Sequence, residues 1–277
     1  MLIRSEVNVS GPLADICILT FAVDRPQALA RCIASVAAQQ GGLRVEHRIL
    51  SERAMALRAH PALAGWRERV VWQPLEGQPF QGASSQRMAR LRAAALAQVE
   101  QPLVAFLDDD NALEPEHLQT LCQCLEDPQL QAAHAWRQVL NPDGTPFPFT
   151  HYPWHDDPLV ANRMYRWGLA HGVFNPGSPV MRDGVRGPEA PDSCATVDMN
   201  EWLFRTECLR NLGFDQRFSQ REVDLRVGED DKLFQRVREQ GVKFACSERA
   251  TVRYYLGGVS NLRQTSGPTQ ACAGAQP

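Results

Sequence analysis

The sequence predicts an α/β protein with a mostly parallel central sheet flanked by helices. Short apolar segments rich in strand-forming residues alternate with segments whose apolar residues recur every three or four positions. One segment, LVAFL at 103–107, is apolar at every position, which is typical of a strand buried on both faces of a parallel sheet. The chain of 277 residues is long enough to bury such a sheet in a single domain.

The elements of the first half follow from these two patterns. We expect strands at 15–21, 45–51, 68–73, 103–107 and 132–140. The helical spacing of apolar residues predicts helices between them at 27–40, about 86–98 and about 114–126. Gly41 and Gly42 end the first helix. This alternation of strand and helix predicts a doubly wound sheet.

The second half is less regular. Residues 141–196 are rich in Pro, Gly, His and aromatic residues, with one candidate helix at 158–169. A connection of this length usually has a binding or lid role, and a mobile lid is suggested by Gly172, Gly177, Gly184 and Gly187. Regular structure is expected to resume with a strand in 197–205, a helix at 229–240 and short strands at 243–247 and 250–255.

Composition argues against several classes of protein. The formal net charge of −3 does not suit binding to nucleic acid through phosphate attraction. No segment has the ~18 uninterrupted apolar residues of a transmembrane helix, and the first residues lack the apolar centre of a secretory signal. The eight cysteines include no CxxC pair, so we expect no structural zinc site. These features predict a reduced, cytoplasmic protein.

Three consecutive aspartates, Asp108, Asp109 and Asp110, close the apolar strand at 103–107. Ligands of open α/β sheets bind beyond the carboxyl ends of the strands. Side chains alternate along an extended chain, so we expect Asp108 and Asp110 to point one way and Asp109 the other. Paired carboxylates suit Mg²⁺ or Mn²⁺ carrying substrate phosphates. The alternative is a polar turn in which one of these residues caps the next helix.

A second acidic cluster, Glu229, Asp230 and Asp231, opens the helix at 229–240. Acidic residues in a first helical turn are common because the helix dipole favours them. Asp230, however, shares a helix face with the apolar positions 233, 234 and 237. A carboxylate that points inward among other carboxylates has a raised pKa, which the dipole opposes. Asp230 is therefore a candidate general base.

Three blocks of sequence together resemble the inverting glycosyltransferases of family 2, which have the Rossmann-like GT-A fold. The blocks are ILTFAVDRPQALARCIASVAAQQ at 18–40, LRAAALAQVEQPLVAFLDDDNALEPEHL at 91–118, and EWLFRTECLRNLGFDQRF at 201–218 followed by GEDDKLFQRVREQG. Each block alone is weak, but their order and spacing match the family. The resemblance extends from about residue 15 to 255.

The resemblance implies roles for the two acidic clusters. Asp108 and Asp110 correspond to the DxD carboxylates, with Asp110 on a divalent cation (Mn²⁺ or Mg²⁺) and Asp108 near the ribose or the cation's water shell. Asp230 corresponds to the catalytic base and Glu229 to its acidic neighbour. Arg92 takes the place of an arginine that steadies the diphosphate or the aspartates.

The resemblance also implies a nucleotide site. Thr20 and Phe21 end the first strand, where the family cradles the base. An Asp-rich turn that reads uracil is often found after the second strand, and here Glu52 stands in that place. The implied donor is a nucleotide sugar, UDP-sugar first, and the acceptor is a small molecule, glycan or lipid-linked sugar. The reaction is sugar transfer with inversion, in the cytoplasm or at the inner face of the membrane.

The same resemblance divides the chain by role. We expect an N-terminal extension at 1–14 and a nucleotide-sugar-binding α/β half at 15–140. An acceptor-binding half that carries the acidic helix follows at 141–260, and a disordered tail at 261–277. The long loop region on the acceptor side belongs to the same single domain as the sheet.

Two further groups in residues 141–196 admit more than one interpretation. The aromatic side chains form either an acceptor platform or core packing under a long loop; they are Tyr152, Trp154, Tyr165 and Trp167. The polar set suggests a metal site only weakly; its members are His151, His155, Asp156 and Asp157.

Three other functions remain open on the sequence alone. A catalytically idle sugar-nucleotide-binding module within a larger complex would share the fold but not need Asp230. A sugar nucleotidyltransferase would need a glycine-rich loop after the first strand, whereas residues 20–28, TFAVDRPQA, contain no glycine. A retaining or metal-independent transferase would differ in product stereochemistry and in its response to chelation.

Overall fold

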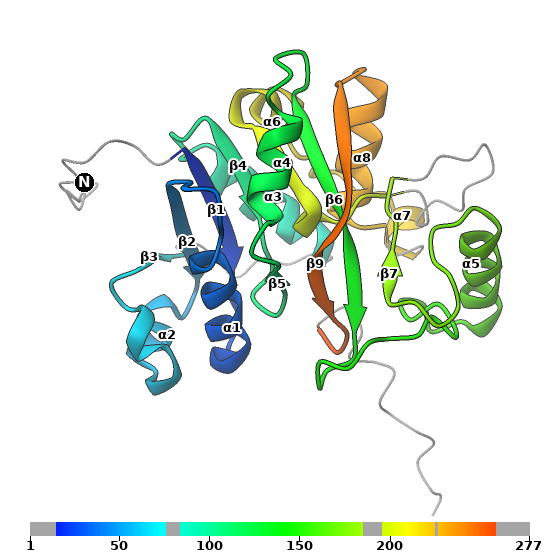
Figure 1. The fold of residues 1–277 in the computed structure, drawn as a ribbon, viewed down its shortest axis with the longest axis horizontal. Helices are drawn as coiled ribbons and strands as arrows, with labels where there is room; N and C mark the ends of the chain where they lie inside the picture. Colours follow the sequence, from blue (N-terminus) through cyan, green and yellow to red (C-terminus); the bar gives the residue numbers. More distant parts are fainter. Residues whose placement is uncertain (1–14, 76–83, 185–195, 225–226, 259–277) are drawn as a thin grey trace, which may run out of the picture.

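One mixed sheet organises the chain, and the computed structural model describes it over residues 15–75, 84–184, 196–224 and 227–258 (Figure 1). The hydrogen-bonded strand order is β3-β2-β1-β4-β8-β6-β9-β5, with β7 paired to β6. The extension at 1–14, the tail at 261–277 and Gly187 lie outside the described residues.

The first half of the sheet is parallel. Its strands are β1 (Ile16–Phe21), β2 (Val45–Ser51), β3 (Val71–Pro74) and β4 (Leu103–Phe106). Ile16 is opposite both Val45 and Leu103, so β2 and β4 flank β1 in parallel register. The carboxyl ends of these strands therefore meet at one edge, where ligands of such sheets bind.

The second half of the sheet contains strands of both directions. Its strands are β5 (Ala112–Leu113), β6 (Ala132–Leu140), β7 (Val180–Met181), β8 (Trp202–Arg205) and β9 (Phe244–Tyr255). β8 is antiparallel to β4, with Leu103 opposite Arg205 and Ala105 opposite Leu203. The start of β8 thus lies beside the end of β4, and this pairing brings the two halves of the chain together at one edge.

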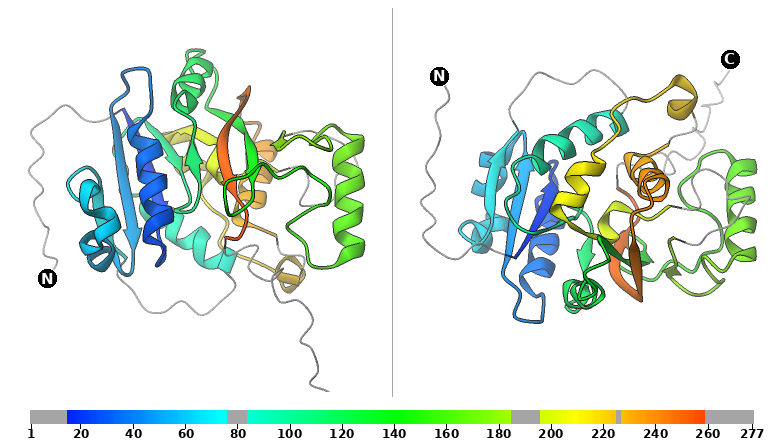
Figure 2. Two further views of the ribbon diagram at one scale, coloured as in Figure 1. Left: turned by 60° about the horizontal axis from the view of Figure 1, so that its bottom comes forward. Right: turned by 90° about the horizontal axis from the view of Figure 1, so that it is seen from above.

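Helices cover both faces of the sheet (Figure 2). They are α1 (Pro26–Ala37), α2 (Ala54–Ala59), α3 (Ser84–Leu96), α4 (His117–Cys124), α5 (Pro158–Ala170), α6 (Thr206–Leu212), α7 (Gln220–Asp224) and α8 (Glu229–Glu239). Short 3₁₀ helices span Pro61–Trp66 (η1) and Met199–Glu201 (η2). Buried residues of α3, α6 and α8 pack on one face, and those of α1 and α4 on the other.

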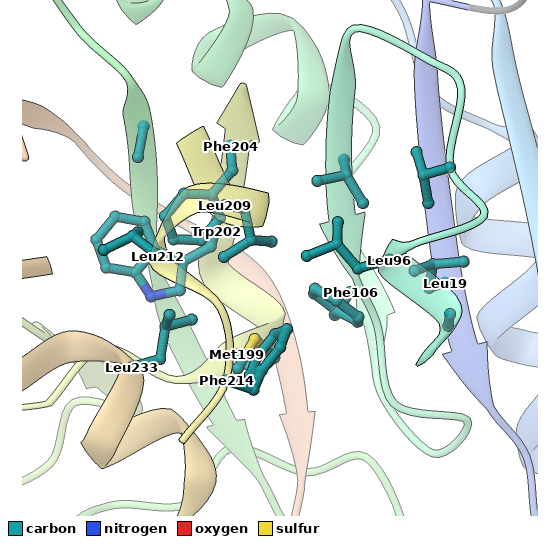
Figure 3. Close-up of a cluster of buried hydrophobic side chains, with 14 of the residues drawn as sticks. Leu19, Leu96, Phe106, Met199, Trp202, Phe204, Leu209, Leu212, Phe214 and Leu233 are labelled. Carbon is teal, nitrogen blue, oxygen red and sulfur yellow. The ribbon is translucent and has the colours of Figure 1, made fainter. Parts of the chain in front are cut away.

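The core on the α3, α6 and α8 side fixes the position of α8. Leu233 of α8 packs with Trp202 of β8 and Phe106 of β4 in the same cluster, together with Leu96 of α3 and Leu209 of α6 (Figure 3). Each of these five side chains is at most 3 % exposed. Burial of this size contributes about 2 kcal/mol per large apolar side chain, so the beginning of α8 is held firmly near the end of β4.

Most predicted elements are confirmed. The strands predicted at 45–51 and 132–140 have those bounds, and α5 and α8 match their predicted helices within one residue. Some predictions were wrong in detail. The strand predicted in 197–205 begins only at Trp202, because Met199–Glu201 form η2. The third strand begins at Val71, and the two short strands predicted near the end are one strand, β9. Its pairing with β6 shifts register near Trp136, and Glu248 has a positive φ of 55°, which explains the break in its sequence pattern.

Within the described residues no helix has the length and apolar character needed to cross a membrane.

Candidate active site

The three aspartates lie beyond the last residue of β4, Phe106, at the carboxyl edge of the parallel strands. The predicted alternation of their side chains was wrong, because the strand ends before them and Asp109 and Asp110 are in a turn. Asp109 and Asp110 both pair with Arg25, whereas Asp108 faces other partners. Asp109 is only 2 % exposed, compared with 16 % for Asp110 and 42 % for Asp108. Asp108 and Asp110 are thus the accessible members.

Asn200 fixes Asp108 by both its main chain and its side chain. The Asn200 Oδ1 accepts the Asp108 N–H at 2.6 Å, and its Nδ2 donates to Asp108 Oδ2 at 2.9 Å. The β4–β8 register leads to this contact, because continuing it from Leu103 opposite Arg205 places residue 200 opposite 108. Asn200 itself is buried. It is a residue of the candidate site that the sequence did not identify.

A chain of polar contacts supports Asn200 from behind. Asp198 Oδ1 accepts from the Asn200 main chain at 2.9 Å and from its amide at 2.6 Å. The other Asp198 oxygen pairs with Arg137, whose side chain is 6 % exposed. Asp108 is therefore held by a continuous series of charged and polar groups that extends into the protein interior.

We predict that Asn200→Ala weakens both stability and ligand binding. The substitution leaves the Asp108 N–H and one carboxylate oxygen without partners, which costs on the order of 1–3 kcal/mol. Urea denaturation measures this loss, with Asn162→Ala on the exposed side of α5 as the control. A variant as stable as the wild type would show that Asn200 does not hold Asp108.

Arg92 of α3 joins the two acidic clusters. Its guanidinium lies 3.4 Å from Asp108 Oδ1 and forms a short ion pair with Glu229. The Arg92 side chain is 4 % exposed and lies against the Phe106 ring, with 5.4 Å from the guanidinium carbon to the ring centroid. The acidic residues at 108 and 229, far apart in the sequence, therefore lie on either side of one buried arginine.

Asp230 lies at the first turn of α8 and keeps partial exposure to solvent. Its Oδ1 accepts the Asp231 N–H at 3.0 Å, while Asp231 accepts the Gly228 N–H at 2.7 Å. The Asp230 carboxylate folds back over Gly228, where an added Cβ would be 2.0 Å from Oδ1. The absence of a side chain at 228 thus leaves room for this orientation of Asp230.

The pKa values of Asp230 and Asp108 are both raised, and the sequence predicted this direction for Asp230. Desolvation, with Asp231 and Glu229 nearby, raises the pKa of Asp230 well above its usual range. Desolvation also raises the pKa of Asp108 to about 7, although Arg92 opposes this and the side chain remains in contact with solvent. A carboxylate with a raised pKa is a better proton acceptor near neutral pH than an ordinary one.

The three residues proposed to contact the nucleotide differ in burial and in their partners. The Thr20 side chain is fully buried and bonded to His47 Nε2 at 2.8 Å, so this side chain is not exposed at the end of β1. Thr20 is on the same side of β1 as Ile18, which packs in the cluster that contains α1. Phe21 is half-buried at the end of β1 and packs against the other core cluster. Glu52 follows β2, is 64 % exposed and pairs with Arg87.

The carboxylates of Asp108 and Asp110 suit a divalent cation that binds together with its substrate. Within the described ranges no group of three or more His, Cys, Asp or Glu side chains is arranged to hold a metal ion. Asp108 and Asp110 offer hard carboxylate oxygens at one strand end. Mg²⁺ commonly binds through one or two carboxylates and completes its coordination with phosphate oxygens and water. The two residues fit this mode of binding.

The aromatic residues of 141–184 form a core of their own under α5. Tyr152 and Trp167 are buried in it with Phe149 and Phe174, while Trp154 and Tyr165 are partly buried. The packing interpretation is therefore confirmed for Tyr152 and Trp167. Asp157 caps α5 by accepting the Leu159 N–H at 2.8 Å. Among the described residues, His151, His155 and Asp156 belong to no group of three or more side chains that could hold a metal ion.

A cavity of about 480 Å³ lies beside this aromatic core. Its lining includes His151, Tyr152, His155, Asp156, Asn162 and Tyr165. Trp154 connects this region to the charged residues behind Asp108. Its ring contacts Tyr254, and the Arg137 guanidinium carbon lies 5.2 Å from its centroid.

A buried acidic cluster surrounds Arg137. Asp183 lies 3.0 Å from its guanidinium and Glu201 3.7 Å, and the two acidic side chains are 1 % and 0 % exposed. Desolvation, followed by the charge of Asp183, raises the pKa of Glu201 well above its usual range, and Arg137 opposes the shift. Glu201 therefore holds its proton in the folded protein at pH values where an exposed glutamate has lost it.

We predict that Glu201→Gln removes a pH-dependent loss of stability. Below the ordinary pKa of 4.5, Glu201 is protonated in both states and matches glutamine. As the pH rises above it, the unfolded chain releases this proton and the folded protein retains it, so the wild type loses stability relative to the variant. Urea denaturation at pH 5 and pH 8 measures the difference. A constant difference between the two proteins would contradict the shift.

Comparison with known proteins identifies the fold. No family model and no curated protein sequence matches the chain. Among solved structures, S. aureus TarS 1–349 in complex with UDP-GlcNAc has a TM-score of 0.53 at 13 % identity, over 92 % of this chain and 62 % of that one. A mannosyltransferase from Pyrobaculum calidifontis, PcManGT, in complex with GDP-Man and Mn²⁺, has a TM-score of 0.55 at 12 % identity, over 90 % and 59 %.

These likenesses concern the fold. The chain spans less than two thirds of the length of both solved proteins. Both share with it an α/β domain with a mostly parallel sheet and flanking helices, as the sequence predicted. The chain has the fold on which a mannosyltransferase is built.

Proposed function

We propose that the protein is an inverting glycosyltransferase of family 2 that uses a nucleotide sugar. The observation that carries the proposal is the bridge formed by Arg92 between Asp108 and Glu229, with Asp230 next along the chain. The solved structures of similar fold support it, because they contain UDP-GlcNAc or GDP-Man with Mn²⁺. The sequence motifs support it independently, since the order and spacing of the three blocks that carry these residues match the family.

The donor half of the proposal concerns the diphosphate. A divalent cation held by Asp108 and Asp110 would supply Lewis-acid stabilisation of the charge that develops on the leaving diphosphate. Arg92 is fixed between two carboxylates and adds a positive charge at the same strand edge. Asn200 holds Asp108 in place. Because the carboxylate is already oriented, no free energy is needed to orient it during the reaction.

The acceptor half concerns proton removal. Asp230 is partly exposed and has a raised pKa, so it suits a base that accepts the proton of an attacking hydroxyl. Glu229 is occupied by Arg92 and acts on the orientation of that arginine. We assign the donor to residues 15–140 and the acceptor to 141–260, where the cavity beside α5 offers aromatic and polar groups. The mobile lid suggested by the four glycines of residues 141–196 and a cytoplasmic location remain predictions.

A thermal-shift screen tests the proposal. UDP, GDP, CDP and dTDP are compared with and without Mn²⁺, because a ligand that binds only the native state raises its melting temperature. UDP is tested first, because Glu52 is the candidate contact to its uracil. We expect one nucleoside diphosphate to stabilise the protein, and to do so more strongly with Mn²⁺. No stabilisation by any of the four would contradict nucleotide-sugar binding.

The second candidate is an idle nucleotide-binding module in a larger complex. It would give the same thermal shift but no turnover. Release of nucleotide from the matching nucleotide sugar, with water or an added acceptor, separates the two functions. Such release, lost in Asp230→Asn, supports the enzyme.

A further inference from the structure

Arg25, at the beginning of α1, holds two members of the aspartate triplet at once. One guanidinium nitrogen lies 2.5 Å from Asp110 Oδ2, and the other forms a short ion pair with Asp109. The Arg25 side chain is 29 % exposed. Arg31 adds a hydrogen bond of 2.8 Å to the Asp110 carbonyl oxygen. Arg25, just before α1, and Arg31, within it, therefore both bind Asp110.

The space around the Asp110 carboxylate is further narrowed by the chain after β9. A Cβ added to Gly258 would lie 2.5 Å from Asp110 Oδ2 and 3.8 Å from the nearest Arg25 nitrogen. Only 16 % of the Asp110 side chain is exposed. A cation that uses this oxygen must take the place of the Arg25 guanidinium, because the main chain at 258 closes another side.

Arg25 and a divalent cation cannot both bind Asp110 Oδ2 closely. Positive groups within a few ångströms of each other repel, and the repulsion is strong where water is scarce. The Asp109 side of Arg25 is different: Asp109 is 2 % exposed and also accepts the Val23 N–H at 2.9 Å. Asp109 is thus the more deeply buried partner of Arg25, and Asp110 is the more exposed one.

We propose that Arg25 occupies Asp110 in the donor-free protein and yields it only when a cation and a nucleoside diphosphate bind together. The diphosphate supplies anionic oxygens that replace Asp110 as the partner of Arg25, while Asp110 binds the cation. The inference rests on the proposed function for its nucleotide, but the competition between Arg25 and the cation stands on the ion pairs alone. Cation and nucleotide then bind cooperatively, and the cation alone binds weakly.

The test is the affinity for Mn²⁺ without nucleotide, measured by water-proton relaxation enhancement. Arg25→Gln is expected to bind Mn²⁺ roughly tenfold more tightly than the wild type. The free energy of one hydrogen bond between charged groups corresponds to about a tenfold change in affinity. Arg44→Gln is the matched control, because Arg44 pairs with Asp15 on the surface with 47 % of its side chain exposed. It should leave the Mn²⁺ affinity unchanged.

Two further variants keep the result interpretable. Arg25→Gln leaves Asp109 buried without its partner, so the double variant Arg25→Gln with Asp109→Asn removes that charge if the single variant fails to fold. Arg25→Gln with Asp110→Asn should lose the gain in affinity, because the released oxygen is then no longer a carboxylate. Circular dichroism confirms that each variant is folded.

Cooperativity supplies the second measurement. The nucleoside diphosphate should tighten Mn²⁺ binding by a larger factor in the wild type than in Arg25→Gln, because only the wild type must free Asp110. A folded Arg25→Gln that binds Mn²⁺ no more tightly than the wild type would overturn the proposal. That result would leave the proposed function untouched, whereas the absence of any nucleotide binding would contradict the function and leave the Mn²⁺ comparison valid.

Discussion

Asp230→Asn is expected to lower donor turnover by roughly 10²–10⁴, the range that a general base contributes. The amide preserves the size of the side chain but does not accept the proton, so nucleotide binding and stability should persist. Nucleotide release from the matching nucleotide sugar measures turnover, and the thermal shift measures binding. Loss of turnover with binding retained is the signature of a base.

Two comparisons make this result specific to the carboxylate of Asp230. Asp231→Asn changes the neighbouring acid, whose oxygen accepts the Gly228 N–H, and an amide oxygen can still accept it. It should retain most of the turnover. Gly228→Ala should reduce turnover by displacing the Asp230 carboxylate, while Gly65→Ala, with open space around its Cβ, should not. Full activity of Asp230→Asn would show that another group accepts the proton.

Arg92→Ala is expected to cost about 3–5 kcal/mol of stability, because it removes the buried guanidinium that pairs with both Asp108 and Glu229. The same change should abolish the thermal shift by the nucleotide. Arg87 offers a matched control on the same helix, α3, where it pairs with exposed Glu52. Arg87→Ala should cost less than about 1 kcal/mol, as surface ion pairs do.

Urea denaturation of the two arginine variants checks this prediction. A similar, small loss for both would contradict the view that Arg92 is the bridge between the acidic clusters. Arg92→Lys adds a further test, since an ammonium keeps the charge but lacks the fork that reaches two carboxylates. We expect it to be intermediate in stability.

The acidic residues of the candidate site could be proposed from the sequence, because their pattern is local. A run of aspartates after an apolar strand, and an aspartate in line with the apolar face of α8, can be recognised without knowing the fold. The position of Asp230 beside Leu233 and Phe234 follows from helical spacing alone. The proximity of the two acidic clusters does not follow from local spacing. It was expected only because of the family resemblance.

The groups that hold the acidic residues could not be predicted, because they depend on strand pairing. Asn200 lies opposite Asp108 only because β8 is antiparallel to β4, and no local pattern indicates that direction. Arg25 stands in a loop, and its pairing with Asp109 and Asp110 spans more than eighty residues of sequence. The burial of the Thr20 side chain, by contrast, follows from period-two alternation, which places it with Ile16 and Ile18 on the face of β1 towards α1.

The most direct test of the central claim is calorimetric titration of the preferred nucleoside diphosphate into the wild type and Asp108→Asn, each with and without Mn²⁺. We predict that Mn²⁺ tightens binding to the wild type and has little effect on the variant, since Asp108 is the more exposed carboxylate of the accessible pair. Equal affinity of the two proteins in the presence of Mn²⁺ would contradict a nucleotide site at the end of β4.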